Sequence, residues 1–141
     1  MVNIEEKIEQ EDEGTHSFVI EKINFFTVLE DELDFFILDK NEVGVAQSQI
    51  EIIRYILENT SQIEKIIFSQ IDNMLASFYK DESGVDSDDM ELSCIFILND
   101  EGGACNYALC FNVSWDEHGF NILMNKESVL EWGGDYTYNG N

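Results

Sequence analysis

Apolar residues recur along this chain with two periodicities, one typical of strands and one typical of helices. The strand periodicity, rich in β-branched and aromatic residues, covers His16 to Leu29 and returns at 33–39. The acidic residues 30–32 between these two runs form a link short enough for an antiparallel hairpin. The pattern therefore predicts two N-terminal strands that pair with each other.

A helical periodicity follows these strands and predicts a central pair of helices. In the first helix, over 46–59, apolar residues fall on one face of a 3.6-residue repeat. The second helix, over 61–78, carries the clearest apolar stripe of the chain, formed by Ile63, Ile66, Ile67, Ile71, Met74, Leu75 and Phe78. Ser61 and Glu64 have the spacing of a capping box, so we expect Thr60 or Ser61 to cap this helix.

The C-terminal half returns to strand patterns, which lie over 92–98, 105–115, 120–125 and 127–132. Within 105–115, alternate residues from Tyr107 to Trp115 form an apolar face. Two strands, two helices and three or four further strands predict an α+β fold, in which a mainly antiparallel sheet packs against the central helix pair. We expect residues 1–14 to be a mobile acidic segment and 15–141 to form a single domain.

The chain is strongly acidic, with 30 acidic and 7 basic residues and a formal net charge of −23 at pH 7. Phosphate groups are also negative, so this field repels nucleic acids and anionic membranes and favours a basic protein partner. Acidity also serves solubility, but an imbalance of this size destabilises the folded state by self-repulsion. We therefore favour a use for the charge in binding, with Asp86, Asp88 and Asp89 as an expected charged rim.

No segment has the roughly 18 continuous apolar residues of a membrane-spanning helix, and the acidic N-terminus lacks the apolar run of a signal peptide. We therefore expect a cytoplasmic protein. Its three cysteines, Cys94, Cys105 and Cys110, are expected to be reduced there. Cys105 and Cys110 fall on opposite faces of one predicted strand, so they cannot form a disulfide within it.

One stretch, CFNVSWDEHGFNI, combines carboxylates, an imidazole and a glycine between two apolar runs. It is interpreted first as a hairpin, in which Asp116 to Gly119 form a four-residue turn. Gly119 supplies the positive φ that such a turn needs, and Asp116 can accept hydrogen bonds from its backbone amides. Trp115 then packs at the end of its strand, while Glu117 and His118 are exposed.

The alternative interpretation of this stretch is a small metal-dependent hydrolase centred on His118. Zinc would need further Cys or His ligands at suitable spacing, and Cys105 and Cys110 do not provide it. Asp116 and Glu117 are neighbours on an exposed turn, whereas general acids normally need burial or a close charge partner. The loop 81–92 lacks the Gly and Glu positions of an EF-hand. We therefore expect a protein that is not an enzyme and has no catalytic residues, metal or cofactor.

The helix pair and this stretch resemble a group of small bacterial domains of unknown function. That group has an Ile-rich helix pair of the form Q…I-x-x-I/L-x-Y/F-L-x-E-N, matched here by Gln49, Tyr55, Leu57, Glu58 and Asn59. Its later Trp-Asp-Glu-Glu-His-Gly sequence is matched by 115–119, with one acid fewer before His118, and Phe120 supplies the following apolar residue. Its Gly-rich tail is matched by Gly133, Gly134 and Asp135. The resemblance covers about 45–138 and implies an α+β domain.

The size, the acidity and the lack of catalytic motifs also resemble immunity proteins of bacterial toxin systems, more loosely. This resemblance implies a non-catalytic protein that neutralises a cognate basic toxin domain, such as a nuclease, by covering its cationic surface. The residues expected to bind the partner are Asp86, Asp88, Asp89, Trp132, Asp135, Tyr136 and Tyr138. A regulatory or adaptor domain with another partner is the alternative, and the sequence predicts no oligomeric state.

Overall fold

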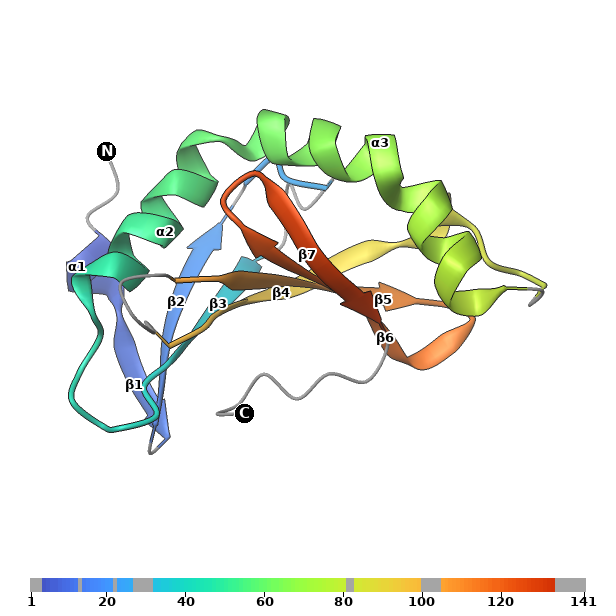
Figure 1. Ribbon diagram of the computed structural model, residues 1–141. Helices are drawn as coiled ribbons and strands as arrows, with labels where there is room; N and C mark the ends of the chain where they lie inside the picture. The colour runs from blue at the N-terminus through green and yellow to red at the C-terminus, as the bar shows by residue number, and fades with distance from the viewer. Residues whose placement is uncertain are drawn as a thin grey trace.

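The computed structural model describes residues 4–12, 14–21, 23–26, 32–80, 83–99 and 105–133, without the side chains of residues 11 and 12. Within them, seven strands form one sheet, and two long helices cross one of its faces (Figure 1). The elements are α1 (Ile4–Lys7), β1 (Glu9–Asp12), β2 (Thr15–Glu21), β3 (Glu32–Leu38), α2 (Gln47–Glu58), α3 (Thr60–Tyr79), the 3-10 helix η1 (Ser87–Asp89), β4 (Glu91–Ile97), β5 (Tyr107–Val113), β6 (Asp116–Asn125) and β7 (Ser128–Gly133).

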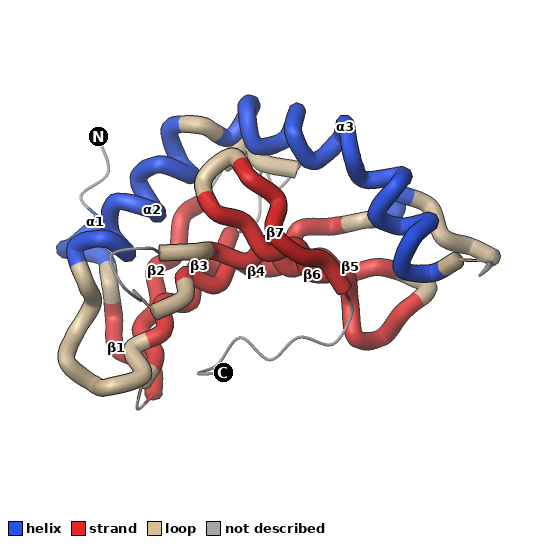
Figure 2. Tube along the Cα trace, in the orientation of Figure 1, coloured by secondary structure: helices blue, strands red, loops and turns tan. Residues whose placement is uncertain are grey.

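The seven strands lie in the sheet in the order in which they occur along the chain. Every neighbouring pair is antiparallel except β3 and β4, which are parallel, with Phe35 opposite Ile95. A parallel pair needs a long crossover connection, and α2 and α3 provide it by running across the sheet from β3 to β4 (Figure 2). This arrangement confirms the predicted α+β fold, with a mainly antiparallel sheet against a helix pair.

The hydrophobic core lies between the helix pair and the sheet. The strands contribute alternate residues, since successive side chains point to opposite faces, and α2 and α3 contribute their apolar stripes. Fully buried members include Leu33, Phe35, Ile37, Ile53, Ile56, Ile63, Ile67, Ile95, Ile97, Tyr107, Leu109, Phe120, Ile122 and Met124. Each such aliphatic or aromatic side chain contributes about 1.5–3 kcal/mol by leaving water, so this layer holds the helices on one face.

A buried glutamine ties the start of α2 to the ends of the two parallel strands. The Gln49 side chain is 2% exposed, and its amide donates hydrogen bonds to the carbonyl oxygens of Leu38, at 2.7 Å, and Leu98, at 2.9 Å. Its Oε1 accepts from the backbone N–H of Ala46 at 2.9 Å. Both N–H donors of this amide and one of the two lone pairs of its oxygen are thereby used. Because burial makes unpaired polar groups costly, these bonds fix where the crossover begins.

Asp39 organises the loop between β3 and α2. Its carboxylate accepts hydrogen bonds from the backbone N–H groups of Val43 and Gly44 and from His16 Nε2, each at 2.9 Å. Burial alone opposes ionisation of Asp39, but the hydrogen bonds from His16, Gly44 and Val43 together outweigh it and lower the pKa of this carboxyl. The ionised carboxylate therefore holds the loop closed and joins it to β2.

The predicted strand from His16 to Leu29 is too long. The observed strand β2 ends at Glu21, and residues 23–26 lie outside the sheet. Phe25 and Phe26 are 0% and 7% exposed, so their apolar side chains fill the core without extending the strand. A positive φ of 49° at Phe26 turns the chain away from the strand direction.

The predicted capping box of the second helix is wrong. The residue at the N-cap position is Asn59, whose side chain makes no capping hydrogen bond. Glu64 does not reach back to the helix start, because its Oε2 accepts from the backbone N–H of Phe26 at 2.9 Å. The apolar stripe is otherwise as expected, except that Phe78 is 43% exposed and Tyr79 is buried beside it.

The N-terminal residues contain more regular structure than their charge suggested. Residues 4–7 form the short helix α1, and β1 adds an edge strand antiparallel to β2. Ile4 is 1% exposed and belongs to the core. The sheet therefore has three strands before the helix pair, where two were expected, because edge pairing through the backbone places little demand on apolar side chains.

No helix of the described residues is long and apolar enough to cross a membrane.

Candidate partner-binding surface

An acid–aromatic–acid row runs along the outer side of α3. Glu64, Phe68 and Asp72 are spaced four residues apart, which places them above one another on a helix. Phe68 is 59% exposed, more than Phe78 of the same helix, at 43%. The row therefore presents an aromatic ring with a carboxylate one turn to each side.

The ring of Phe68 rests on a short stack of aromatic rings that leads into the core. It contacts Phe26 edge to face, with ring centroids 5.5 Å apart, and Phe26 contacts Phe111 in the same way at 5.1 Å. Phe26 and Phe111 are buried. Because edge-to-face pairs favour one geometry, Phe68 is held in place although most of its ring faces solvent.

The segment 83–90, which contains η1, forms the other wall of this surface. Asp86 is the N-cap residue of η1, and its Oδ1 accepts the backbone N–H of Asp88 at 3.0 Å. Two adjoining hollows of about 250 Å³ and 280 Å³ share Ser87 and separate this segment from α3. Their lining residues, here called the α3–η1 surface, are Phe26, Glu64, Ile67, Phe68, Ile71, Asp72, Leu75, Ala76, Tyr79, Lys80, Val85, Asp86, Ser87, Asp88, Met90 and Phe111.

Negative charge dominates the α3–η1 surface. Its lining residues include four carboxylates, from Glu64, Asp72, Asp86 and Asp88, and among the described lining residues Lys80 is the one cation. Asp89 is exposed immediately beside them. Of the seven residues predicted to bind a partner, Asp88 lines the same hollow as the exposed ring of Phe68, and Asp86 lines the adjoining hollow. An apolar hollow with an acidic border is suited to a lysine or arginine side chain, whose stem is apolar and whose head is cationic.

The polar stretch Asp116–Gly119 is not a turn. The chain reverses at Ser114 and Trp115, and β6 already begins at Asp116, which lies opposite Val113. The next pair joins Phe111 to Phe120, so residues 117–119 on β6 face the single residue Asn112. The three residues therefore form a bulge, and the predicted positive φ of Gly119 is confirmed at 76°.

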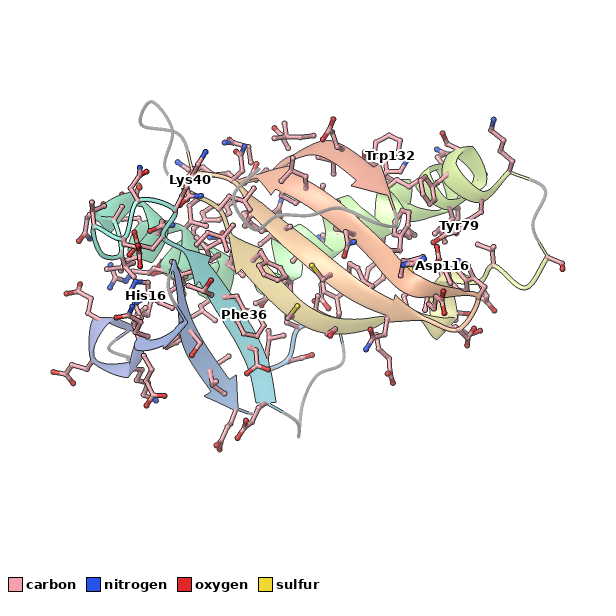
Figure 3. All side chains as sticks on the ribbon, turned by 90° about the horizontal axis from the view of Figure 1, so that it is seen from below. His16, Phe36, Lys40, Tyr79, Asp116 and Trp132 are labelled. Atoms are coloured by element: carbon pink, nitrogen blue, oxygen red, sulfur yellow. The ribbon has the colours of Figure 1, made fainter. Side chains whose placement is uncertain are left out.

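Asp116 joins this bulge to the end of α3. Its Oδ1 accepts the backbone N–H of His118 at 3.0 Å, as expected, and its Oδ2 accepts the Tyr79 hydroxyl at 2.9 Å (Figure 3). Trp115 packs edge to face against Tyr79, and its buried indole Nε1 has no hydrogen-bond partner among the described residues. These contacts give Asp116 and Trp115 a structural role at the base of α3.

Glu117 and His118 point into solvent. Their side chains are 89% and 57% exposed, and His118 Nε2 lies 3.7 Å from Glu117 Oε1. This geometry is that of a surface ion pair, which contributes about 0–1 kcal/mol. Among the described residues, no group of three Cys, His, Asp or Glu side chains is placed to hold a metal ion.

The predicted aromatic anchors near the C-terminus are only partly within the described chain. Trp132 lies in β7 opposite Ile122, and its side chain is half-buried against the core. It is therefore less available than Phe68 for a partner. Asp135, Tyr136 and Tyr138 lie outside the described residues.

A larger hollow, of about 570 Å³, lies between α2 and the turn that joins β6 to β7. Its lining carries Glu51 and Glu58, but also Arg54 and Lys126. The two signs compensate each other, so this hollow has no preference for a cationic partner. The α3–η1 surface, with four carboxylates and one lysine, has the larger excess of negative charge.

Sequence reasoning missed Phe68 and Glu64 as candidate binding residues. Phe68 falls outside the apolar stripe of its helix, and carboxylates lie four residues before and after it. A helical wheel therefore places the aromatic side chain of Phe68 on the polar face of the helix. An aromatic residue in such a position can be recognised from the sequence as a candidate for binding. The pairing of this row with Asp88 depends on tertiary structure and has no signal in the sequence.

No protein-family model, curated protein or solved structure matches this chain. The resemblance carried by the helix pair and by residues 115–120 stays a prediction. The α3–η1 surface is defined by its own geometry and charge.

Proposed function

We propose that this protein is a non-catalytic binding protein that holds a basic protein partner on its α3–η1 surface. The observation that carries the proposal is the row Glu64–Phe68–Asp72, in which an exposed aromatic ring lies between carboxylates and faces Asp88 across an apolar hollow. Aromatic residues with arginine or lysine partners dominate many protein interfaces. We expect the partner to insert such a basic side chain beside Phe68.

The net charge of −23 supports this proposal at longer range. A field of one sign raises the rate at which an oppositely charged partner arrives, and fixed local charges then set its orientation. The four carboxylates of the surface are well placed for the second task. The other acidic residues of the chain supply the long-range field that raises the rate of arrival.

The more specific form of the proposal is an immunity protein that acts in the cytoplasm. It would neutralise a cognate basic toxin domain, such as a nuclease, by covering the cationic surface with which that domain holds phosphates. Such inhibition needs complementary charge and shape, and no bond is made or broken. We propose no catalytic role for His118, since its pairing with the exposed Glu117 resembles a surface ion pair.

The test uses the purified basic domain of the protein encoded next to this gene. We expect it to bind the wild-type chain and to bind Phe68→Ala about tenfold or more weakly, as for a central aromatic contact. Leu130→Ala is the matched control, because Leu130 is an exposed apolar residue on β7, at 44% exposure. Isothermal titration calorimetry measures all three affinities.

Equal weakening by the two substitutions would contradict the assignment of the surface. A neighbouring gene that encodes no basic domain would contradict the immunity form of the proposal. If the chain binds a non-cationic partner and does not bind the basic domain, the regulatory or adaptor alternative is favoured.

A further inference from the structure

Two of the three cysteines face each other across neighbouring strands on the face of the sheet opposite α2 and α3. Cys94 of β4 and Cys110 of β5 are direct partners in the antiparallel register. Cα atoms of such partners lie about 4.5–5.5 Å apart, which is within the range of about 4.4–6.8 Å that a disulfide requires. Directly opposed residues also project to the same face of the sheet, so the two Cβ atoms do not point apart, as a bridge requires.

In the described part of the chain, both cysteines of this pair are partly exposed. Both thiols are free, and both residues are half-buried on the face of the sheet opposite the buried neighbouring pair Ile95 and Leu109. The same cross-strand row continues to Asp34 on β3 and to Asn121 on β6. Phe36, labelled in Figure 3, pairs with Phe96 in the adjoining row, with ring centroids 5.4 Å apart. None of the described helices covers this face.

The two thiols differ in acidity because one donates a hydrogen bond to the other. The hydrogen bond from Cys110 lowers the pKa of the Cys94 thiol, helped by Ser93 and opposed by burial and by the charge of Asp34. The same interaction, together with burial, raises the pKa of Cys110. One sulfur is thus favoured as the thiolate and the other as its proton donor, which is the division of roles needed for thiol–disulfide exchange.

We propose that Cys94 and Cys110 are a reactive pair that forms a reversible disulfide across β4 and β5, with Cys94 as the attacking thiol. The oxidant is a low-molecular-weight disulfide. The Cys94 thiolate attacks one of its sulfur atoms, and the other leaves as a thiolate. Cys110 then gives its proton to the released small thiolate, attacks the Cys94 sulfur of the mixed disulfide and displaces the second small molecule as a thiolate, which takes a proton from water. Two protein thiols are oxidised, and one small disulfide is reduced to two thiols.

Cys105 provides an internal comparison, because it is a thiol without these features. It is 6% exposed, and its Sγ lies 3.4 Å from the carbonyl oxygen of Leu98. It precedes β5 and has no cysteine opposite it in the register. The inference concerns the helix-free face and is independent of binding at the α3–η1 surface, so either proposal can fail alone.

The experiment treats the folded full-length chain with oxidised glutathione and counts free thiols by alkylation and intact mass. We expect the count to fall from three to one, with a mass loss of two hydrogen atoms, and to return to three with dithiothreitol. Trypsin cannot locate the bond, because no Lys or Arg lies between Lys80 and Lys126. Cleavage after Glu101 and after Tyr107 separates the three cysteines, and a cross-linked pair should then join the peptides of Cys94 and Cys110.

Three single substitutions assign the roles. Cys110→Ser should stop at a mixed disulfide, with one glutathione on Cys94. Cys94→Ser should add glutathione at Cys110 more slowly than Cys110→Ser adds it at Cys94, since burial still raises the pKa of the Cys110 thiol in that variant. Cys105→Ala is the control and should still lose two thiols. Circular dichroism checks that each variant is folded, and the Cys105→Ala result alone decides the pairing if a serine variant unfolds.

Several outcomes would overturn the proposal. They are retention of all three thiols after treatment, a bond that includes Cys105, and a disulfide formed only between two chains. Faster reaction of Cys110 than of Cys94 would overturn the assigned order.

Discussion

A Cβ atom at Gly119 would lie 2.6 Å from the backbone oxygen of Phe111, closer than such atoms approach in proteins. Gly119 is buried in β6 and has a φ of 76°. Both facts follow from the bulge, which brings the backbone of β6 against that of β5 where residues 117–119 face Asn112. The glycine in the polar stretch is therefore required by the sheet and needs no functional explanation.

Substitution of Gly119 by alanine should destabilise the fold strongly. The positive φ alone costs about 1–3 kcal/mol for a residue with a Cβ atom, and the contact with Phe111 adds to it because neither backbone can move freely. Gly84→Ala is the matched control, since Gly84 has a φ of 83° and nothing within 4 Å of its added Cβ. Urea denaturation should show a larger loss for Gly119→Ala, and equal losses would contradict the close approach.

Tyr79→Phe should remove one hydrogen bond while keeping the aromatic packing. The hydroxyl donates to Asp116 Oδ2, and the ring packs against Trp115 and Phe120. We expect a loss of about 0.5–1.5 kcal/mol in the free energy of unfolding, the usual net value of such a bond. Tyr79→Ala removes the ring as well and should cost about 3–5 kcal/mol. A similar loss for both substitutions would show that packing contributes little.

Asp39→Asn should destabilise the protein in a manner that depends on pH. The folded-state pKa of Asp39 is lowered from 3.8, so its ionised form contributes stability above the unfolded pKa, and this contribution is lost as pH falls through the folded value. At pH 7 we expect Asp39→Asn to lose about 1–3 kcal/mol, because a charged acceptor of three hydrogen bonds is replaced. The difference from wild type should shrink below about pH 3.8. An equal difference at pH 7 and pH 3 would contradict the lowered pKa.

The fold class was predictable because periodicity reports which face of an element is buried. The stripe that contains Ile63, Ile67 and Ile71 and the alternation from Tyr107 to Phe111 are confirmed by their burial. The parallel pairing of β3 and β4 was not visible, because it depends on the direction in which the helix pair returns. The strand β1 was hidden by its acidic composition, since edge pairing uses backbone groups.

Local polar patterns were a weaker guide than apolar ones. The capping-box spacing of Ser61 and Glu64 exists, but Glu64 bonds to Phe26, which is remote in sequence. The stretch from Asp116 to Gly119 has the composition of a turn, yet the register of Phe111 with Phe120 places it in a strand. A polar side chain has several possible partners, and tertiary contacts decide among them.

The candidate surface was predictable only in its charge. The acids Asp86, Asp88 and Asp89 were identified from composition, and the structure places Asp88 beside Phe68. That neighbour comes from α3, about twenty residues earlier in the chain. Such a pairing depends on how α3 packs against η1, which no local pattern encodes.

The most direct test of the proposed function is the association rate constant of the neighbouring gene's basic domain at several salt concentrations. The chains compared are wild type, Asp86→Asn/Asp88→Asn and the control Glu5→Gln/Glu9→Gln, whose exposed carboxylates lie in α1 and β1. We predict a steep fall with salt for wild type and a rate about tenfold lower for the Asp86/Asp88 variant at low salt, with a smaller change for the control. A rate that is independent of salt and equal in all three chains would contradict recognition through this acidic surface.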